Sequence, residues 1–389
     1  MALRSRAFAL AGAACVAGAL ALAGCGQTSS GSSSNLTVSG RTLRIYVSDP
    51  ANVRHDAVAQ DVVDAERLAF TKQYAEVTDF RLQLVNATNP TASENAREAI
   101  EDNKAIAYLG EIAPGSSDQT VGITNALDLL QVSPTDTALE LTTRTAAVKS
   151  APQTYYQDWS QYGGTFARIA PSSAQEARAQ VAEMRALGVT SLYVAHDSSD
   201  YGRALAVALA ADAHAAGIGL RGSIRTAQAV FYASDSPAVA ARFLRAAAST
   251  APGAKLFGPS ALDSSAFTTA IGSDLHNVYV TIPGVLPDQL NAGGKAFERA
   301  FRTAYHHRPS VQAVFGYAAM SALLRVIQQA GRSANDRTKL VRDFFAFKQP
   351  RSVLGALRIS SDGDSSLDAF VIASLRNGSL VPVKAAPSR

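Results

Sequence analysis

From Thr42 onward, strand-like and helix-like segments alternate along the chain. The segment TLRIYVSD (42–49) is rich in β-branched and aromatic residues, and HDAVAQDVVDAERLAFTKQ (55–73) has the period of an amphipathic helix. The same pair of patterns returns several times. Strands separated by helices of this length indicate βαβ units, because parallel neighbours need a long crossover connection. Right-handed crossovers then place helices on both faces of each parallel sheet.

The alternation comes in two series, separated by a long aperiodic segment at 144–164 that holds the only tryptophan, Trp159. We interpret this aromatic segment as a loop. The first series predicts strands at 42–49, 81–88, 105–110 and 130–134, with helices at 55–73, 93–102 and 117–130. The second predicts strands at 165–171, 191–197, 229–235, 254–260 and 277–283, with helices at 172–188, 201–217 and 237–248.

Two series of this kind predict an α/β fold of two Rossmann-like lobes, each built on a parallel sheet. We expect the chain to cross between the lobes three times, near residues 165, 281–283 and 355. Several short hinges make a cleft whose walls move together, and ligands of open parallel sheets bind beyond the carboxyl ends of the strands. Asn377-Gly378 predicts a hairpin turn in the tail. The expected division is lobe 1 at 41–165 and 282–353, and lobe 2 at 166–281 and 354–389.

The first 40 residues have a different character. Arg4 and Arg6 precede an apolar stretch at 7–23, which is the layout of a secretory signal peptide, expected here at 1–24. Leu22-Ala23-Gly24-Cys25 resembles the bacterial lipobox, whose cysteine is lipidated and becomes the mature N-terminus. The alternative is an uncleaved membrane anchor, but a spanning helix needs about 20 apolar residues and this stretch is slightly short. Residues 25–40 are then a lipid-anchored flexible linker, since 27–35 is rich in serine and glycine.

The remaining composition excludes several classes of protein. Cys15 leaves with the signal peptide, so Cys25 has no partner for a disulfide. With 389 residues, of which 47% are hydrophobic, the chain is long enough for two cores. Its formal net charge is +4 and its basic residues are dispersed, which argues against a nucleic-acid partner. No segment after residue 40 is long and apolar enough to span a bilayer.

Three motifs resemble catalytic or cofactor sites but lack the neighbouring secondary structure or the spacing that such sites need. The glycines of 217–222 fit G-x-G-x-x-G, but a helix precedes them and strand-like residues follow, the reverse of a dinucleotide site. We interpret them as a helix C-cap and a turn. His306 and His307 are adjacent and would point about 100° apart on a helix. Asp362-Gly363-Asp364 lacks the spacing of a calcium loop. We therefore expect no enzyme activity, cofactor or metal.

Five segments resemble the type I periplasmic solute-binding proteins, and in particular the leucine/isoleucine/valine-binding group of ABC importers. They are SPTDTALELT (133–142), ARIAPSSAQEARA (167–179), SLYVAHDSSDYGRALA (191–206), KLFGPSALDSSAF (255–267) and VFGYAAMSALLRVIQQAG (314–331). The resemblance covers nearly all of 41–375. It implies a ligand held between two lobes, and the residues below are carried over one at a time.

From lobe 1, the resemblance implies contacts from Ser116 and Ser117, at a turn whose free amides and hydroxyls suit a ligand carboxylate. It also implies a backbone carbonyl and a hydroxyl from Thr135 and Thr137. Each has a plainer alternative: a serine helix cap at 115–117, and a cap of the following helix by Thr137. From lobe 2, Tyr201 matches the tyrosine that closes over the ligand, although core tyrosines are also common.

The chain also departs from the family. An acidic residue that follows Gly-Pro in lobe 2 holds the ligand ammonium in amino-acid binders, and here that residue is Ser260. Either Asp263 or Asp235 takes its place, or the ligand is not an α-amino acid, since an unpaired buried charge is costly. Lobe 2 is also shortened between Gly222 and Ala229, and the aromatic loop 152–164 is longer.

The function expected from these features is solute binding. A lipid-anchored protein on the outer side of the cell membrane would capture an amino acid or related small carboxylate and deliver it to ABC permease subunits. We expect a monomer. Two alternatives stay open: a sensory lipoprotein of the same fold that signals to a membrane receptor, and a scaffold whose cleft no longer binds. A hydrolase is the last choice, since no nucleophile–base pair is evident.

Overall fold

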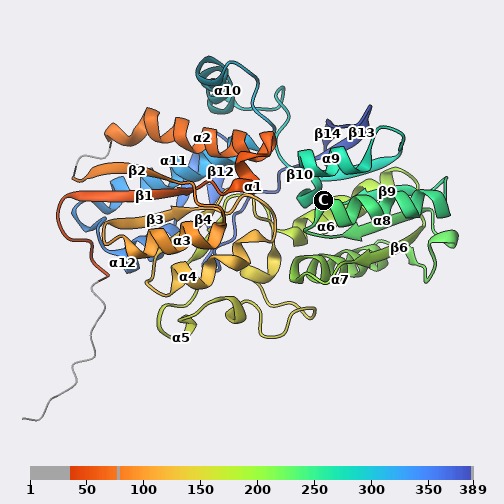
Figure 1. Ribbon diagram of the computed structural model, residues 1–389, viewed down its shortest axis with the longest axis horizontal. Coiled ribbons are helices and arrows are strands. Elements are labelled where there is room, and N and C mark those ends of the chain that lie inside the picture. Colours follow the sequence, from red (N-terminus) through yellow and green to blue (C-terminus); the bar gives the residue numbers. More distant parts are fainter. Residues whose placement is uncertain (1–35, 77–78, 387–389) are drawn as a thin grey trace, which may run out of the picture. The chain divides into compact units, whose positions relative to one another are not determined.

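The computed structural model describes residues 36–76 and 79–386. The predicted signal peptide, Cys25 and most of the predicted linker lie outside the described residues. Within the described part, the strands form a five-stranded sheet, a seven-stranded sheet and a separate two-stranded hairpin. Figure 1 shows the two larger sheets, each with helices packed on it. We call the five-stranded sheet with its helices the first lobe and the seven-stranded sheet with its helices the second lobe.

The first lobe has a fully parallel sheet in the order β2-β1-β3-β4-β5. Its strands are β1 (Thr42–Ser48), β2 (Arg81–Ala87), β3 (Ala105–Leu109), β4 (Leu130–Ser133) and β5 (Phe166–Arg168). Its helices are α1 (Ala51–Arg54), α2 (Ala57–Gln73), α3 (Ala92–Glu101), α4 (Val121–Asn125), α5 (Trp159–Tyr162), α10 (Ala292–Tyr305), α11 (Ala313–Ala330) and α12 (Arg337–Phe345). The helices α2, α11 and α12 pack on one face, and α3 and α4 pack on the other.

The second lobe has the strand order β14-β13-β10-β9-β8-β6-β7. Five strands are parallel: β6 (Ser191–His196), β7 (Gly219–Leu220), β8 (Ala229–Ala233), β9 (Lys255–Gly258) and β10 (Val278–Pro283). The strands β13 (Phe370–Arg376) and β14 (Ser379–Ala385) are antiparallel additions at one edge. The helices α6 (Ser173–Ala186) and α7 (Asp200–Ala215) cover one face, and α8 (Pro237–Thr250) and α9 (Ser265–Ile271) cover the other.

The two places where the chain enters the second lobe differ in detail from the sequence-based expectation. β5 pairs with β4 in the first lobe, so the chain leaves that sheet only after Arg168. β11 (Lys348–Ser352) and β12 (Gly355–Arg358) form their own hairpin, and Leu357 and Ile359 pack in the first-lobe core. The chain therefore reaches the second sheet at β13 and not near Gly355. The lobe boundaries given above stay predictions.

The first-lobe core depends on a close approach of two helices. Gly316 on α11 lies against the backbone of α2, and a Cβ at this position would be 2.2 Å from the carbonyl oxygen of Val62. Only glycine fits such a contact without moving a backbone. The close packing lets α2 and α11 share one apolar face, with Phe315 and Leu323 fully buried there.

Some local predictions are confirmed and one is wrong. The Asn377-Gly378 turn joins β13 and β14, with both residues at positive φ. Gly217 has φ +78° and follows Ala216, the C-cap of α7, so these glycines begin where a helix ends and not at a dinucleotide loop. The helix predicted at 117–130 is wrong: a 3₁₀ turn at Ser116–Gln119 precedes the short α4, and Asp128 has φ +50°. The predicted loop 144–164 contains α5 and a 3₁₀ turn at Gln153–Tyr155.

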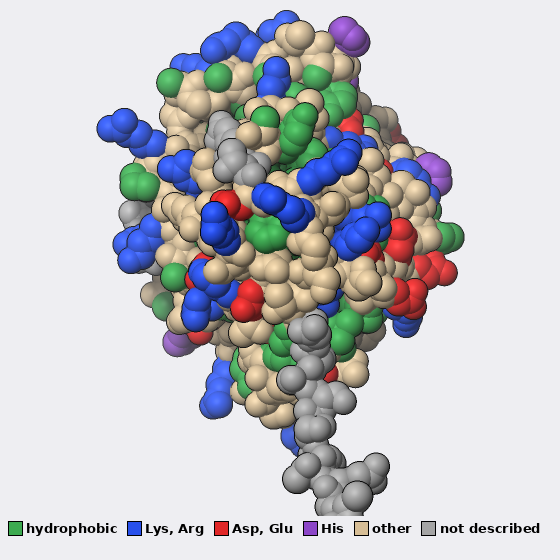
Figure 2. Space-filling view, turned by 90° about the vertical axis from the view of Figure 1, so that its left-hand side faces the viewer, with side chains coloured by type: hydrophobic (Ala, Val, Ile, Leu, Met, Phe, Trp, Pro, Cys, Tyr) green, Lys and Arg blue, Asp and Glu red, His purple; other side chains and the backbone are tan. Residues whose placement is uncertain are grey.

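The surface of the first lobe carries mixed charges. Figure 2 shows Lys and Arg side chains spread over the face at the left of Figure 1, interspersed with Asp and Glu and without a single basic stripe. Among the residues that the structure describes, no helix combines the length and the apolar character that a membrane crossing needs.

Candidate functional site

A buried carboxylate, Glu176, lies where the two lobes meet. Glu176 is in the first turn of α6 and is fully buried. Its Oε1 accepts hydrogen bonds from the Ser260 amide, at 2.6 Å, and from the Thr281 hydroxyl, at 2.6 Å, and its Oε2 accepts from the Ser260 hydroxyl at 3.0 Å. Burial raises the pKa of Glu176 to about 7, and these hydrogen bonds limit the rise. The carboxylate is thus held by the turn that follows β9 and by β10 itself.

Besides Ser260, two further side chains predicted to contact a ligand converge on the same carboxylate. The hydroxyl of Thr137, from the first lobe, lies 3.4 Å from Glu176 Oε2 and 3.2 Å from the Ser260 hydroxyl. The Tyr201 hydroxyl, from α7, lies 3.4 Å from each of the same two groups. We call Thr137, Glu176, Tyr201, Ser260 and Thr281 the Glu176 cluster. All five are at most 2% exposed, so the cluster joins the lobes with a side chain of the protein at its centre.

The turn predicted to bind a ligand carboxylate also holds a carboxylate of the protein. The amides of Gly115 and Ser117 donate to the two oxygens of Asp136, at 2.7 and 2.9 Å. The Ser117 hydroxyl accepts from the Glu111 amide at 3.1 Å, and the Ser116 hydroxyl donates to the Ala113 carbonyl. The sequence-based expectation of free amides here is therefore not met, because Asp136 was not recognised as their partner.

Thr135 lies beside this turn with an internal bond of its own. Its hydroxyl donates to the carbonyl of Ile112 at 2.6 Å, and its side chain is fully buried. In addition, the Ala138 amide donates to Asp136 at 3.0 Å, so Thr137 does not act as the cap of the 3₁₀ turn that follows. Thr135 and Asp136 are thus held by hydrogen bonds within the first lobe, whereas the Thr137 hydroxyl faces the second lobe.

Next to the Glu176 cluster, a cavity of about 270 Å³ opens between the lobes. The first lobe contributes residues from 52–59 and 112–114 together with Gln312, and the second contributes Asp235, Pro237 and residues from 260–266. Ser260 belongs to both regions, with its hydroxyl in the cluster and the residue in the cavity wall. The cavity is thus lined by three of the four second-lobe residues predicted from the sequence, Asp235, Ser260 and Asp263, whereas Tyr201 lies in the cluster beside it.

Two hydrogen bonds cross between the lobes at the cavity. Gln312 Nε2, at the start of α11, donates to Asp263 Oδ2 at 2.7 Å. Asp56 caps α2 by accepting from the Val58 and Ala59 amides, and its second oxygen accepts from the Ser265 amide of the other lobe at 2.7 Å. An acidic side chain therefore supports each contact, one from each lobe.

The carboxylates of the cavity are harder to ionise than exposed ones. Burial raises the pKa of Asp263 to about 6, with the Gln312 hydrogen bond opposing the rise and the negative charge of Asp56 adding to it. Burial and the neighbouring Asp197 raise the pKa of Asp235 to about 6 as well. No Lys, Arg or His among the described residues lines the cavity to offset these effects.

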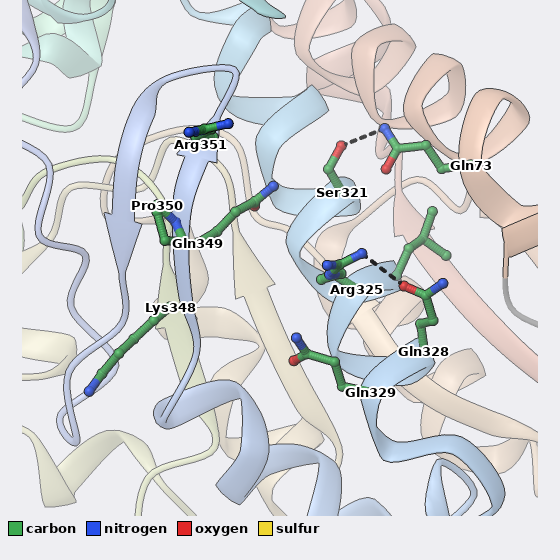
Figure 3. Close-up of a pocket in the computed structure, with 10 residues that line it drawn as sticks. Gln73, Ser321, Arg325, Gln328, Gln329, Lys348, Gln349, Pro350 and Arg351 are labelled. Atoms are coloured by element: carbon green, nitrogen blue, oxygen red, sulfur yellow. Dashed lines mark hydrogen bonds between the residues drawn. The ribbon is translucent and has the colours of Figure 1, made fainter.

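A larger pocket lies in the first lobe, away from the residues predicted to bind a ligand. This groove, of about 680 Å³, runs between α11, the end of α2 and β11. Figure 3 shows its lining, with Gln73 bonded to Ser321 and Arg325 bonded to Gln328. The groove is lined by one lobe only, so closure of the lobes does not change it. The smaller cavity is the better candidate for a binding site.

Metal and catalytic groupings were not expected from the sequence. In the described part of the chain, no group of three or more His, Cys, Asp or Glu side chains could hold a metal ion. His306 is a C-cap residue at positive φ, and His307 lies 3.6 Å from Asp61 at the surface.

Sequence reasoning missed Glu176, the centre of the cluster. The helical period was a usable signal, because Ser173, Ala177, Gln180 and Met184 are buried on one face of α6 and Glu176 lies on that face. Gln180 there donates to the Gly258 carbonyl and to the Thr281 hydroxyl, both at 2.7 Å. An acidic residue on a buried face needs hydrogen-bond partners, which could have drawn attention to it.

Known structures resemble this arrangement closely in fold. A leucine-binding protein from Thermotoga maritima has a TM-score of 0.71 at 17% identity, over 89% of this chain and 99% of that one. The chain has the type I periplasmic binding protein fold. A substrate-binding protein of an ABC transporter from Desulfitobacterium hafniense, in complex with Leu, has a TM-score of 0.69 at 20% identity, over 88% and 100%. A solute-binding protein from R. palustris, in complex with benzoate, has a TM-score of 0.65 at 18% identity, over 90% and 96%.

The sequence comparisons agree with the fold. A model of the periplasmic binding protein family matches residues 225–372, which span the second-lobe strands from β8 to β10, the first-lobe helices α10 to α12, the β11–β12 hairpin and the start of β13. No curated protein matches the chain in sequence. The family is one of solute-binding proteins and not of enzymes.

Proposed function

We propose that this periplasmic-type binding protein is a lipid-anchored, extracytoplasmic solute receptor that captures a small molecule between its lobes and delivers it to an ABC importer. The observation that supports this best is the 270 Å³ cavity, whose walls come from both lobes of a type I fold. A solute there contacts both lobes only when they are closed. Its differential affinity for the closed form then drives closure, and a permease can distinguish the closed form from the open one.

The hydrogen bonds across the cavity already favour closure of the lobes, and a solute adds to their contribution. The bonds Gln312–Asp263 and Asp56–Ser265 join the lobes at its rim, and Thr137 meets Ser260 beside it. Each is a single hydrogen bond, with a net contribution of about 1 kcal/mol. Closure without a solute is thus weakly favoured by these contacts, and a ligand that contacts both walls shifts the balance further.

The solute class expected from the resemblance is an amino acid or a related small carboxylate. Leucine and benzoate are bound in two of the similar structures. An amino acid carries both an ammonium and a carboxylate, so the chemistry of the cavity walls decides which charge is recognised. In the proposed closed form, Thr137, Tyr201 and Ser260 join the lobes through the Glu176 cluster. Asp235 and Asp263 face the solute.

One observation favours a second candidate, a scaffold that binds nothing. The Glu176 and Asp136 carboxylates already use the donors of Ser260, Thr281, Gly115 and Ser117. The lobes therefore meet without a solute at this point. The cavity beside the cluster, whose walls come from both lobes, favours binding over this alternative.

The test is a thermal-shift and calorimetric screen of residues 26–389, which retain the whole described part, against amino acids, amines and small carboxylates. One molecule per chain should bind, and at a hundred times its dissociation constant it adds about 2.7 kcal/mol of stability. Ala113→Trp, at the exposed edge of the cavity, should block binding, whereas Ala211→Trp, exposed on α7, should not. A screen with no binder of any class would contradict the proposed function.

The lipid anchor is tested separately, in cells. Feeding a clickable palmitate analogue should label the wild-type protein in the membrane fraction. Cys25→Ser should lose the label and the membrane association, while Cys15→Ser should keep both. Equal labelling of the Cys25→Ser variant would contradict the anchor without affecting the solute-binding proposal.

A further inference from the structure

The Gly115 and Ser117 amides, which belong to the turn expected to hold a solute carboxylate, are bonded to a carboxylate of the protein, and a second carboxylate of the protein occupies the donors around Ser260. Asp136 accepts from the amides of Gly115, Ser117 and Ala138. Glu176 accepts from Ser260 and Thr281. A solute carboxylate at either place would have to displace a buried side chain. It would also leave a carboxylate of the protein without partners, which is costly in a buried position.

The space that remains has acidic walls. The side chains of Asp56, Asp235 and Asp263 line the cavity, and none of the described residues that line it is Lys, Arg or His. A negatively charged solute would meet like charges at short range, where partial burial weakens the screening by solvent. A positively charged group would instead supply the partner that Asp235 and Asp263 lack.

The rest of the wall is uncharged, with polar groups from Asn52, Ser260, Ser264 and Gln312 and otherwise small apolar residues. Val53, Ile112, Pro114, Pro237 and Ala261 contribute to it. Their surfaces suit a short hydrocarbon body and not a second charged group. At about 270 Å³, the cavity is slightly smaller than the usual small-molecule site of about 300 Å³ or more. The ligand that fits these walls is therefore small, apolar over most of its surface and cationic at one end.

Building on the proposed function, we propose that the solute is a small organic amine without a free carboxylate, whose protonated nitrogen is recognised by Asp263 and Asp235. The bond from Gln312 occupies Asp263 Oδ2 and holds the carboxylate between the lobes. An ammonium bound there touches a second-lobe carboxylate that is already bonded to the first lobe. Recognition of the cation and closure of the lobes are thereby coupled.

The raised pKa values of the two aspartates agree with this arrangement. With pKa values of about 6, both are mostly ionised at neutral pH. An ammonium beside them favours the ionised form and offsets part of the burial that raises their pKa. Amine binding should therefore weaken as the pH falls below about 6.

The experiment compares three compounds with the same hydrocarbon body: leucine, its decarboxylated amine 3-methylbutylamine, and its deaminated acid 4-methylpentanoate. Calorimetry on residues 26–389 at neutral pH is extended to amines from methylamine to phenethylamine. We expect an amine to bind at least tenfold more tightly than the amino acid or the acid of the same body. Leucine or an acid binding as tightly as its amine would overturn the inference and leave the proposed function standing. No binding by any compound would overturn both.

Variants identify the charges that matter. Asp263→Asn keeps an oxygen for Gln312 and removes the charge, so it should weaken amine binding about ten- to a hundredfold. Asp235→Asn, at a more exposed position, should weaken it several-fold. Asp362→Asn, an exposed acid outside the cavity, is the control and should have no effect. An amine that binds both cavity variants as tightly as the wild type would contradict the assignment of Asp263 and Asp235, even if all variants fold.

Discussion

The Glu176 cluster and the acidic cavity lie side by side between the lobes and share Ser260, but the carboxylates in the two regions have different partners. Glu176 is fully buried and has a donor for each of its oxygens. Asp235 and Asp263 border open space, and no basic residue lines that space among those described. A carboxylate whose oxygens are already hydrogen-bonded, such as Glu176, links the lobes without a solute. A carboxylate without a positive partner, such as Asp263, can bind a cation. The Glu176 cluster therefore holds the lobes together, and the cavity recognises the solute.

The largest expected effect comes from removing the carboxylate of the cluster. Glu176→Ala leaves the Ser260 amide and the Thr281 hydroxyl without acceptors in a buried place, and should lower the free energy of unfolding by roughly 3 kcal/mol. Asp263→Asn, which keeps its bond to Gln312, should change it by less than about 1 kcal/mol. Urea unfolding at neutral pH measures both. Equal losses in the two variants would remove the distinction between the regions.

A smaller effect follows from the titration of Glu176. Its pKa in the folded protein, about 7, is above the ordinary value of 4.5, so the folded state holds this proton more tightly than the unfolded state. The resulting stability is present below the ordinary value and is lost as the pH rises through about 7. Relative to Glu176→Gln, which does not titrate, the wild type should lose stability between about pH 5 and pH 8. A difference between the two proteins that does not change with pH would contradict the burial of an ionisable group here.

The smallest effect is expected at the edge of the cluster. The Tyr201 hydroxyl is 3.4 Å from both Glu176 and Ser260, so its bonds are long, and Tyr201→Phe should cost only about 0.5 kcal/mol. Tyr201→Ala should cost several kcal/mol because it empties a buried space. Amine affinity should be nearly unchanged in Tyr201→Phe. A large loss of affinity in this variant would show that the tyrosine hydroxyl contacts the solute, and would join the two regions into one site.

Most of the fold could be predicted from the sequence because it follows from short-range patterns. The alternation of 42–49 with 55–73, and its repeats, indicated parallel sheets with helices, and Asn377-Gly378 indicated the hairpin of β13 and β14. The failure at 117–130 has a local cause: the chain breaks into a 3₁₀ turn and the short α4, and Asp128 adopts positive φ. The hydrophobic period of the sequence alone does not predict such breaks in a helix.

The site was less accessible because its chemistry is set by contacts between distant segments. Thr137, Tyr201 and Ser260 could be chosen one by one, but their common partner Glu176 comes from a fourth segment. Asp136 is adjacent to Thr137 in the sequence, and yet its bonds to the amides of Gly115 and Ser117 depend on how two loops meet. Whether a donor is free or already bonded is a property of the folded chain.

The most direct measurement is a crystal structure of residues 26–389 with the tightest binder from the screen. We expect one molecule in the cavity between the lobes, in contact with both walls, with its nitrogen within hydrogen-bond distance of Asp263. A solute that lies instead in the first-lobe groove of Figure 3, or one whose carboxylate displaces Glu176 from Ser260, would contradict a binding site built on the acidic cavity.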